Sequence, residues 1–370
     1  MSARRLFLST ALLALSAAAV LAADRPGQKF GISINDLPKP YATPGMANPA
    51  QKIPRPEGVL PQVPPGFKIE IFASGLREPR WLATAADGDI FVAEPGIGRI
   101  TRLHRSGGRV AAVTVADGFN RCHGLAVSGD TLYVADLKAV WRLTFPNGPL
   151  KPAKRERVTT VADLSPSGNH WTRDLAIDSK GILYIGIGSA SNVGEDAPTR
   201  ATVQTVNPDG TLKTFAGGLR NAVGLAFYPG TDNLFVTVNE RDGLGDGLVP
   251  DYLTHVQRGG FYGWPYAYLG NHPDPDYGAK RPDLVAKAIV PDLLFQAHSA
   301  PLGLVFYEGA QFPAAYKGDA FVALHGSWNA GAPTGYKVVR VPFKNGRPAG
   351  GYENFVTGFW DGAIKPGDPA

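Results

Sequence analysis

Short apolar segments with alternating polar positions follow one another along most of the chain, separated by glycine and proline turns. Residues 215–240 show the unit most fully: an apolar segment ends in Gly-Leu, a polar corner follows at Arg220 and Asn221, and two further apolar segments flank the turn at residues 229–230. Period-two alternation between such turns is typical of β-strands. The unit recurs at four other places, residues 72–94, 115–136, 161–189 and 295–326. The pattern predicts a repeating all-β fold.

The spacing of the repeats indicates a β-propeller. Equivalent leucines lie 43, 50, 50 and 79 residues apart, at Leu82, Leu125, Leu175, Leu225 and Leu304. Repeats of about 40 to 50 residues with several strands each are typical of propeller blades. We interpret the long interval as a blade with an insertion at residues 241–292. A strand and corner begin again at residues 353–362 without the rest of the unit, which predicts an incomplete sixth blade and open sheet edges beside it.

The segment before the repeats has two parts. Arg4 and Arg5 precede an apolar run too short to span a membrane, and residues 1–22 are predicted to be a signal peptide cleaved after Ala22. We favour the general secretory pathway over the twin-arginine pathway, because Ala3 stands where Ser or Thr is usual. Residues 23–65 are rich in proline and glycine, which predicts an extended arm along the surface. Residues 66–370 then form the propeller domain. The protein is predicted to be exported to the periplasm or secreted.

The composition excludes several kinds of site and gives no indication of a charged macromolecular partner. The 370 residues include 45 glycines and 32 prolines, which suits short strands and turns. Cys122 is the one cysteine, so a disulfide framework, a cysteine zinc site and a C-x-x-C-H haem site are excluded. The net charge of +5 is weak and scattered, and it does not indicate a nucleic-acid or membrane partner.

The polar corners carry the candidate chemistry. Because inner strands of a propeller begin at the central channel, His123, His170, Arg220, Asn221 and His298 are expected to converge there. A neutral histidine can accept a proton and an arginine can hold a planar anion. For any single histidine a structural role is the more common one, and the three at equivalent corners together make a catalytic role equally plausible.

A second candidate is the loop that begins at residues 239–242 and continues to Asp246 and Asp251. Its closely spaced carboxylates suit a hard cation such as Ca²⁺, and solvated loop acids are the alternative. Trp328 could stack on a flat ligand or pack within the protein. The chain has no P-loop, no Rossmann glycine fingerprint and no Ser-His-Asp motif context.

Several segments together make the chain resemble the soluble quinoprotein sugar dehydrogenases, particularly the sorbosone dehydrogenase and aldose sugar dehydrogenase type. They are GNHWTRDLAI, GSASNVGED, GGLRNAVGLAF, VNERDGLGDGLVPDYLT, GGFYGWPY, HSAPLGLVFY and FVALHGSWN, and they occur in the family's order. The resemblance covers about residues 67–360. It implies a six-bladed propeller that binds pyrroloquinoline quinone (PQQ) over its channel, with Ca²⁺ against the quinone.

The resemblance also implies roles for individual residues. His170 matches the base that takes the substrate's hydroxyl proton, and Arg220 matches the arginine beside it. The implied contacts to PQQ are Arg220, Asn221, His298, His325, Trp328 and Lys337, and the implied calcium turn is Glu240, Arg241 and Asp242. The glucose-type members carry an aspartate before the base where this chain has Asn169. They also use basic residues of the sixth blade on the cofactor's carboxylates, for which Lys337 would be a partial substitute.

We therefore predict an exported PQQ- and Ca²⁺-dependent dehydrogenase that oxidises a small sugar and passes electrons to an external acceptor. Two alternatives remain open at this point: a Ca²⁺-dependent propeller lactonase and a sugar-binding propeller without catalysis. The lactonase would require carboxylates at several corners, where this chain has His, Arg and Asn.

Overall fold

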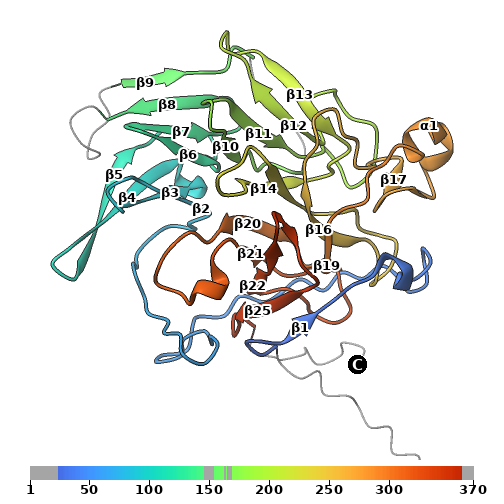
Figure 1. Cartoon of the computed structure of the whole chain (residues 1–370), viewed down its shortest axis with the longest axis horizontal. Helices are drawn as coiled ribbons and strands as arrows, with labels where there is room; N and C mark the ends of the chain where they lie inside the picture. The colour runs from blue at the N-terminus through green and yellow to red at the C-terminus, as the bar shows by residue number, and fades with distance from the viewer. Residues whose placement is uncertain (1–23, 146–153, 162–163, 165–168, 361–370) are drawn as a thin grey trace, which may run out of the picture.

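In the part of the chain that the structure describes, five β-sheets are arranged as propeller blades, and two further sheets have two strands each (Figure 1). The computed structural model describes residues 24–145, 154–161, 164 and 169–360. The predicted signal peptide lies outside these residues. The fold is all-β, as expected: among the described residues the only α-helix is α1 (Pro282–Val285). No helix there is long and apolar enough to cross a membrane.

Each blade has four antiparallel strands in chain order. Blade one contains β2 (Trp81–Thr84), β3 (Ile90–Glu94), β4 (Arg99–Ser106) and β5 (Arg109–Ala116). Blade two contains β6 (Leu125–Ser128), β7 (Thr131–Ala135), β8 (Val140–Thr144) and β9 (Lys154–Arg157). Blade three contains β10 (Leu175–Ile177), β11 (Leu183–Ile187), β12 (Thr202–Val206) and β13 (Leu212–Gly217). Blade four contains β14 (Ala222–Phe227), β15 (Leu234–Val238), β16 (Pro250–His255) and β19 (Leu293–Ala297). Blade five contains β20 (Pro301–Phe306), β21 (Ala320–Leu324), β22 (Lys337–Val341) and β25 (Tyr352–Val356).

The five aligned leucines all lie on the first strand of a blade, which confirms the repeat. Four of them are buried, whereas Leu82 is 59% exposed and the neighbouring Trp81 is buried instead. The first strands of successive blades approach closely. A Cβ atom on Gly124 would lie 2.3 Å from the carbonyl oxygen of Arg173, and one on Gly224 would lie 2.2 Å from that of Leu302. Glycine is therefore required at these two positions, because any side chain would push neighbouring blades apart.

The predicted sixth blade is wrong. The strand in residues 353–362 is β25, the outermost strand of blade five, which pairs with β22. In three repeats the unit read from the sequence begins one strand early. The apolar segment before the corner is the end of the last strand of the preceding blade, namely β5, β13 or β19. A strand followed by a corner therefore marks the end of a blade.

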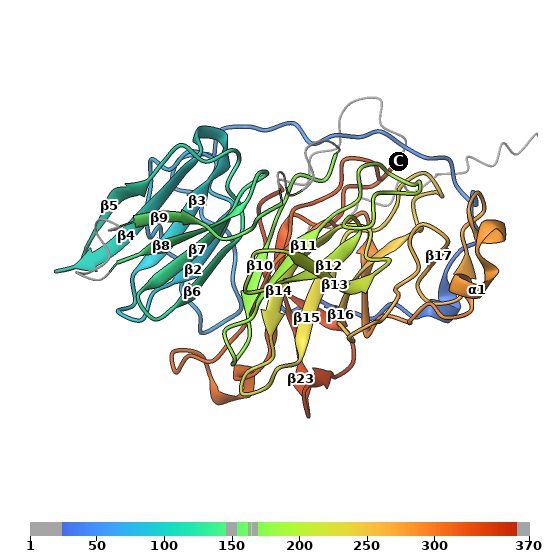
Figure 2. The same ribbon diagram turned by 90° about the horizontal axis from the view of Figure 1, so that it is seen from above.

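The predicted open edge on blade five is also wrong, because the N-terminal arm covers it. In the arm, β1 (Lys29–Phe30) pairs with β25, and Gln62 forms an isolated bridge with Thr357. Between these contacts the arm is extended apart from η1 (Ile34–Asp36). Figure 2 shows the blue arm running along one side of the molecule.

The insertion in blade four is shorter than predicted. It does not begin at Arg241, because β16 belongs to the blade; the inserted segment lies between β16 and β19. It contains the hairpin of β17 (Ala267–Tyr268) and β18 (His272–Pro273), then η3 (Gly278–Lys280) and α1. The backbone of Tyr262 donates to the carbonyl of Gly217, and Trp264 donates to that of Gly218. The insertion is thus fixed against the end of β13.

The remaining short elements lie in connections. They are η2 (Pro95–Ile97), η4 (Ala314–Tyr316), β23 (Phe343–Lys344) and β24 (Arg347–Pro348).

Candidate functional site

The corners of blades three, four and five and part of the arm enclose a cavity of about 740 Å³. This volume is in the range of small-molecule sites. The wall combines aromatic, imidazole, amide and carboxylate groups with two cations. Its residues are Pro49, Ala50, Gln51, Lys52, Ile53, His170, Arg220, Asn221, Asn239, Glu240, Asp242, Asp251, His298, Ala300, His325, Gly326, Ser327, Trp328, Asn329, Tyr336 and Phe359.

The structure brings most of the predicted site residues to this cavity. His170, Arg220, Asn221 and His298 come from corners that precede the first strands of blades three, four and five. His325 and Trp328 come from the loop after β21, and Glu240 and Asp242 from the loop after β15. Trp328 is 56% exposed at the rim, so its indole is available to a flat ligand.

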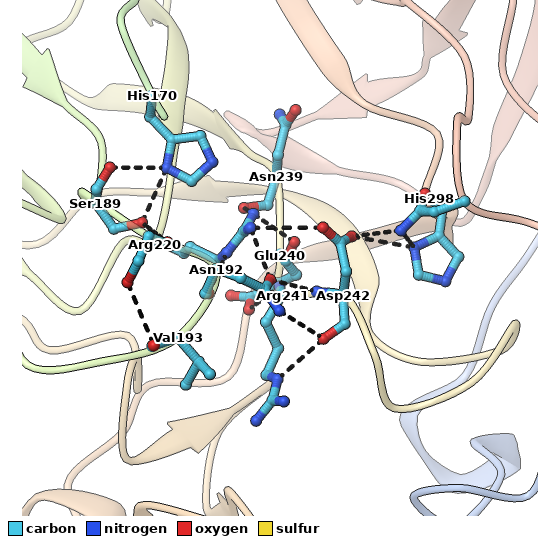
Figure 3. Close-up of polar contacts among 12 residues, drawn as sticks. His170, Ser189, Asn192, Val193, Arg220, Asn239, Glu240, Arg241, Asp242 and His298 are labelled. Carbon is cyan, nitrogen blue, oxygen red and sulfur yellow. Dashed lines mark hydrogen bonds and ion pairs between the residues drawn. The ribbon is translucent and has the colours of Figure 1, made fainter. Parts of the chain in front are cut away.

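His170 is held as a neutral imidazole with one nitrogen free. Its Nδ1 lies 2.9 Å from the carbonyl oxygen of Ser189 and 2.9 Å from the Ser189 hydroxyl (Figure 3). A carbonyl can only accept, so Nδ1 carries the proton and Nε2 keeps its lone pair. In the described part of the chain, Nε2 has no hydrogen-bond partner. Burial, assisted by the charge of Arg220, lowers the pKa of His170 to about 3. The neutral imidazole with a free Nε2 lone pair is the form that can accept a proton.

Arg220 supports the loop below the cavity. Its Nε donates to the carbonyl of Asn192 (2.8 Å), and Nη1 donates to the carbonyls of Asn239 (3.1 Å) and Glu240 (2.6 Å). Its Nη2 donates to Oδ1 of Asn192 at 2.9 Å and lies 3.7 Å from Oδ2 of Asp242. Four N–H groups are thus committed to the protein. Little donor capacity is left for a ligand, so the main contribution of Arg220 is its charge and the position of the loop.

Three carboxylates gather on the other side of Arg220. The buried carboxyl of Asp251 accepts from the backbone N–H groups of Glu240 and Ala300, each at 2.8 Å. Glu240 is 3% exposed, and its Oε1 has no partner among the described residues. Burial raises the pKa of Glu240 and that of Asp251 to about 7.

Asp242 is the ionised member of the group. Burial opposes its charge, but hydrogen bonding with His298 and the charge of Arg220 hold its pKa below the usual value. Asn329 donates to its Oδ1 at 2.7 Å. His298 lies with Nδ1 3.5 Å from the same oxygen and Nε2 3.1 Å from the carbonyl of Gly245. His298 also has φ 64°, in the left-handed region, a conformation that costs a non-glycine residue about 1–3 kcal/mol.

Three predicted residues do not reach the cavity. His123, expected at the channel, is buried, and the centre of its ring lies 5.2 Å from that of the Trp81 ring and 5.5 Å from that of Trp171. The Lys337 Nζ lies 3.0 Å from Oδ2 of Asp24 and 4.1 Å from the centre of the Phe30 ring, and its side chain is 1% exposed. The first position of β22 turns this lysine toward the arm, away from the cavity, so the expected cofactor contact is corrected. The guanidinium of Arg241 pairs with Asp274 in the insertion, so only its backbone remains available to a cation.

Sequence reasoning missed four residues that shape the site. Ser189 orients His170. The backbone N–H of Asn169, which stands where the glucose-type members carry an aspartate, donates to the carbonyl of Ala190. The amide oxygen of Asn192 accepts hydrogen bonds from Nη2 of Arg220 and from the backbone N–H of Asp242. Ser189 and Asn192 both lie in the segment GSASNVGED that carries part of the resemblance. Asn329 ends FVALHGSWN, another segment of the resemblance, whereas Lys52 had no comparable signal.

The residues present fit a flat, anionic ligand of moderate size. The cavity is large enough, has an exposed indole at its rim, and combines Arg220 and Lys52 with three histidines. The site offers fewer side-chain ligands for a metal ion. Within the described residues, no group of three or more His, Cys, Asp or Glu side chains is placed to hold one. Ca²⁺ prefers six to eight oxygens. It would therefore need Asp242 and the unpartnered Oε1 of Glu240 together with backbone carbonyls and ligand oxygens.

The chain was compared with known proteins. The model of a family described as TrAA12-like matches residues 61–249 and 283–357. An uncharacterised protein of Borreliella burgdorferi is 30% identical over 316 residues, which are 80% of this chain and 81% of that protein. The pyrroloquinoline quinone-dependent pyranose dehydrogenase of Coprinopsis cinerea is 26% identical over 331 residues, 75% of this chain. The match spans 44% of that enzyme's length.

Solved structures share the fold. The PQQ domain of pyranose dehydrogenase from Coprinopsis cinerea, in its holo form, has a TM-score of 0.68 and 23% identity, over 84% of this chain and 88% of that chain. The PQQ-bound aldose sugar dehydrogenase of Streptomyces coelicolor has a TM-score of 0.57 and 20% identity, over 80% and 85%. At these identities the likeness is evidence for the propeller fold.

Proposed function

Because this chain belongs to the TrAA12-like family, we propose that it is an exported, PQQ-dependent dehydrogenase that oxidises a sugar with His170 as the general base. The observation that carries the proposal is the state of His170 in the cavity. Its Nδ1–H is fixed on Ser189, its Nε2 lone pair is free, and burial keeps the imidazole neutral by lowering its pKa. The relatives that are sugar dehydrogenases supply the substrate class.

The chemistry divides between the ligand and the protein. When bound, PQQ would supply the two-electron oxidant that accepts a hydride from the sugar carbon. Nε2 of His170 would accept the proton of the sugar hydroxyl, and Ser189 would keep the imidazole in the required tautomer. Arg220, one residue before Asn221 at the same corner, would stabilise negative charge that develops near it. The exposed indole of Trp328 would pack on a flat ring.

A Ca²⁺ ion is part of the proposal. Asp242, Glu240 and the backbone of residues 239–242 would hold it, and it would act as a Lewis acid on an oxygen of the bound quinone. Asn192 would keep this loop in place, because it accepts from the Asp242 backbone N–H at 2.8 Å and donates to the Asp242 carbonyl at 3.0 Å.

Reconstitution tests the proposal. The purified chain is incubated with PQQ and Ca²⁺, and reduction of a dye acceptor is measured over a panel of neutral and acidic sugars. We expect His170→Ala to reduce kcat by roughly 10²–10⁴, the usual contribution of a positioned base, with little change in PQQ affinity. His104→Ala is the matched control, because His104 lies in blade one with its side chain 48% exposed. Full activity in His170→Ala would refute the assignment of the base.

A further inference from the structure

The cavity wall differs in charge from one part to another. All three of its carboxylates, Glu240, Asp242 and Asp251, belong to blade four. The part formed by arm residues 49–53 and the loop after β21 includes Lys52 and His325 and no carboxylate. A ligand with separate anionic and metal-binding ends would therefore find two different environments.

The arm is fixed where it passes the cavity. The backbone N–H of Asn48 donates to the carbonyl of Trp328 at 2.7 Å, and its Nδ2 donates to the carbonyls of Ala330 and Gly331 at 3.2 and 3.3 Å. Upstream, the hydroxyl of Thr43 accepts from the backbone of Asp246 at 2.7 Å. These bonds join the arm to loops of blades four and five. The segment that follows, residues 49–53, is thus a built part of the wall.

Lys52 is a cation without a counterion there. Within the described residues its ammonium has no ion pair or hydrogen bond, and the side chain is exposed. Its charge acts on the neighbouring imidazole of His325. The pKa of His325 is lowered by burial, by the charge of Arg80 and by the charge of Lys52. Arg80 is a second cation on this side, and its guanidinium lies 5.8 Å from the centre of the Trp171 ring.

We infer that Lys52, carried by the N-terminal arm, is an anion-binding residue of the cavity and receives a carboxylate of the bound ligand. An ammonium on a flexible stem binds such a group as a point charge. The inference deepens the proposed function and rests on it in assigning the ligand. The carboxylate has two possible sources, the quinone cofactor or an acidic sugar. In either case the arm supplies a binding residue that the five blades do not.

Binding measurements on the full chain test this without relying on turnover. The apo protein, at fixed Ca²⁺, is titrated by calorimetry with PQQ and, separately, with benzene-1,3,5-tricarboxylate. Lys52→Met is compared with Lys52→Arg and with Lys39→Met, an exposed lysine of the same arm that does not line the cavity. We expect Lys52→Met to raise Kd about three- to tenfold, as loss of an exposed charge pair does. The effect should shrink at high salt, and the other two variants should stay within twofold.

The outcomes distinguish the cofactor's carboxylate from the substrate's carboxylate. They also distinguish failure of the Lys52 anion site from failure of the proposed dehydrogenase function. A higher Kd for PQQ in Lys52→Met shows that Lys52 binds a carboxylate of the cofactor. An unchanged Kd for PQQ with a higher Kd for an acidic sugar, but not for a neutral one, shows that Lys52 binds the substrate's carboxylate. If the wild type binds the tricarboxylate through Lys52 but not PQQ, the proposed function fails and the anion site stands. If Lys52→Met alters none of these quantities while its melting temperature is normal, the inference is wrong.

Discussion

Replacing Arg220 with methionine should destabilise the protein strongly, because this guanidinium holds together three segments. It is 5% exposed and donates to the carbonyls of Asn192, Asn239 and Glu240 and to the amide oxygen of Asn192. Methionine fills similar volume but donates nothing. Each buried acceptor left unpaired costs about 1–3 kcal/mol.

The total should be smaller than four such losses, because the residues line a cavity that water can enter. We expect the free energy of unfolding to fall by about 3–5 kcal/mol, the usual result of removing one partner from a buried charged network. Arg220→Lys keeps the charge but cannot reach all four acceptors, so an intermediate loss is expected.

Urea unfolding of the cofactor-free protein at pH 7 measures the difference. Arg142→Met is the matched control, since the Arg142 side chain is 46% exposed and pairs with Glu156 at the surface. Its loss should cost less than about 1 kcal/mol. A change below about 1 kcal/mol in Arg220→Met would refute the reasoning, because it would mean that water satisfies the loop carbonyls equally well.

Three further outcomes are expected. First, kcat/KM should show no fall near pH 6.5, because His170 with a pKa of about 3 stays neutral well below that pH; an acidic limb at 6.5 that disappears in His170→Gln would contradict this. Second, Glu240 has a folded pKa of about 7 against an ordinary 4.5, so its contribution to stability is present below pH 4.5 and is lost as the pH rises through 7. Glu240→Gln should reduce that loss, and Ca²⁺ should raise the wild-type melting temperature more at pH 8 than at pH 5; equal metal shifts at the two pH values would refute the carboxylate's role. Third, Lys337→Met should destabilise the protein by about 1–3 kcal/mol and speed proteolysis of the arm, because it removes the contact to Asp24; the exposed Lys344→Met is the control, and identical proteolysis rates would exclude an anchoring role.

The sequence by itself determined the strands and the convergence of the corners. Alternation and turn residues are local properties, so the five leucine-centred strands could be predicted from them. A repeat places equivalent corners at equivalent points in space, which is why His170 and His298 could be expected at one cavity although 128 residues separate them. The number of blades could not be predicted in the same way. A strand followed by a corner looks the same at the beginning and at the end of a blade, and only the pairing of β25 with β22 distinguishes them.

The tertiary structure decided the direction of each side chain and the role of the arm. Lys337 and Lys52 are both lysines near the same blade, but the strand turns the first toward Asp24, while the bonds of Asn48 place the second at the cavity. Arg220 looked like a ligand-binding cation until its four donors were found to be committed to loop oxygens. The physical reason is that hydrogen bonds and ion pairs between distant segments depend on how those segments pack, and the arm has no periodic pattern that would indicate its path across the blades.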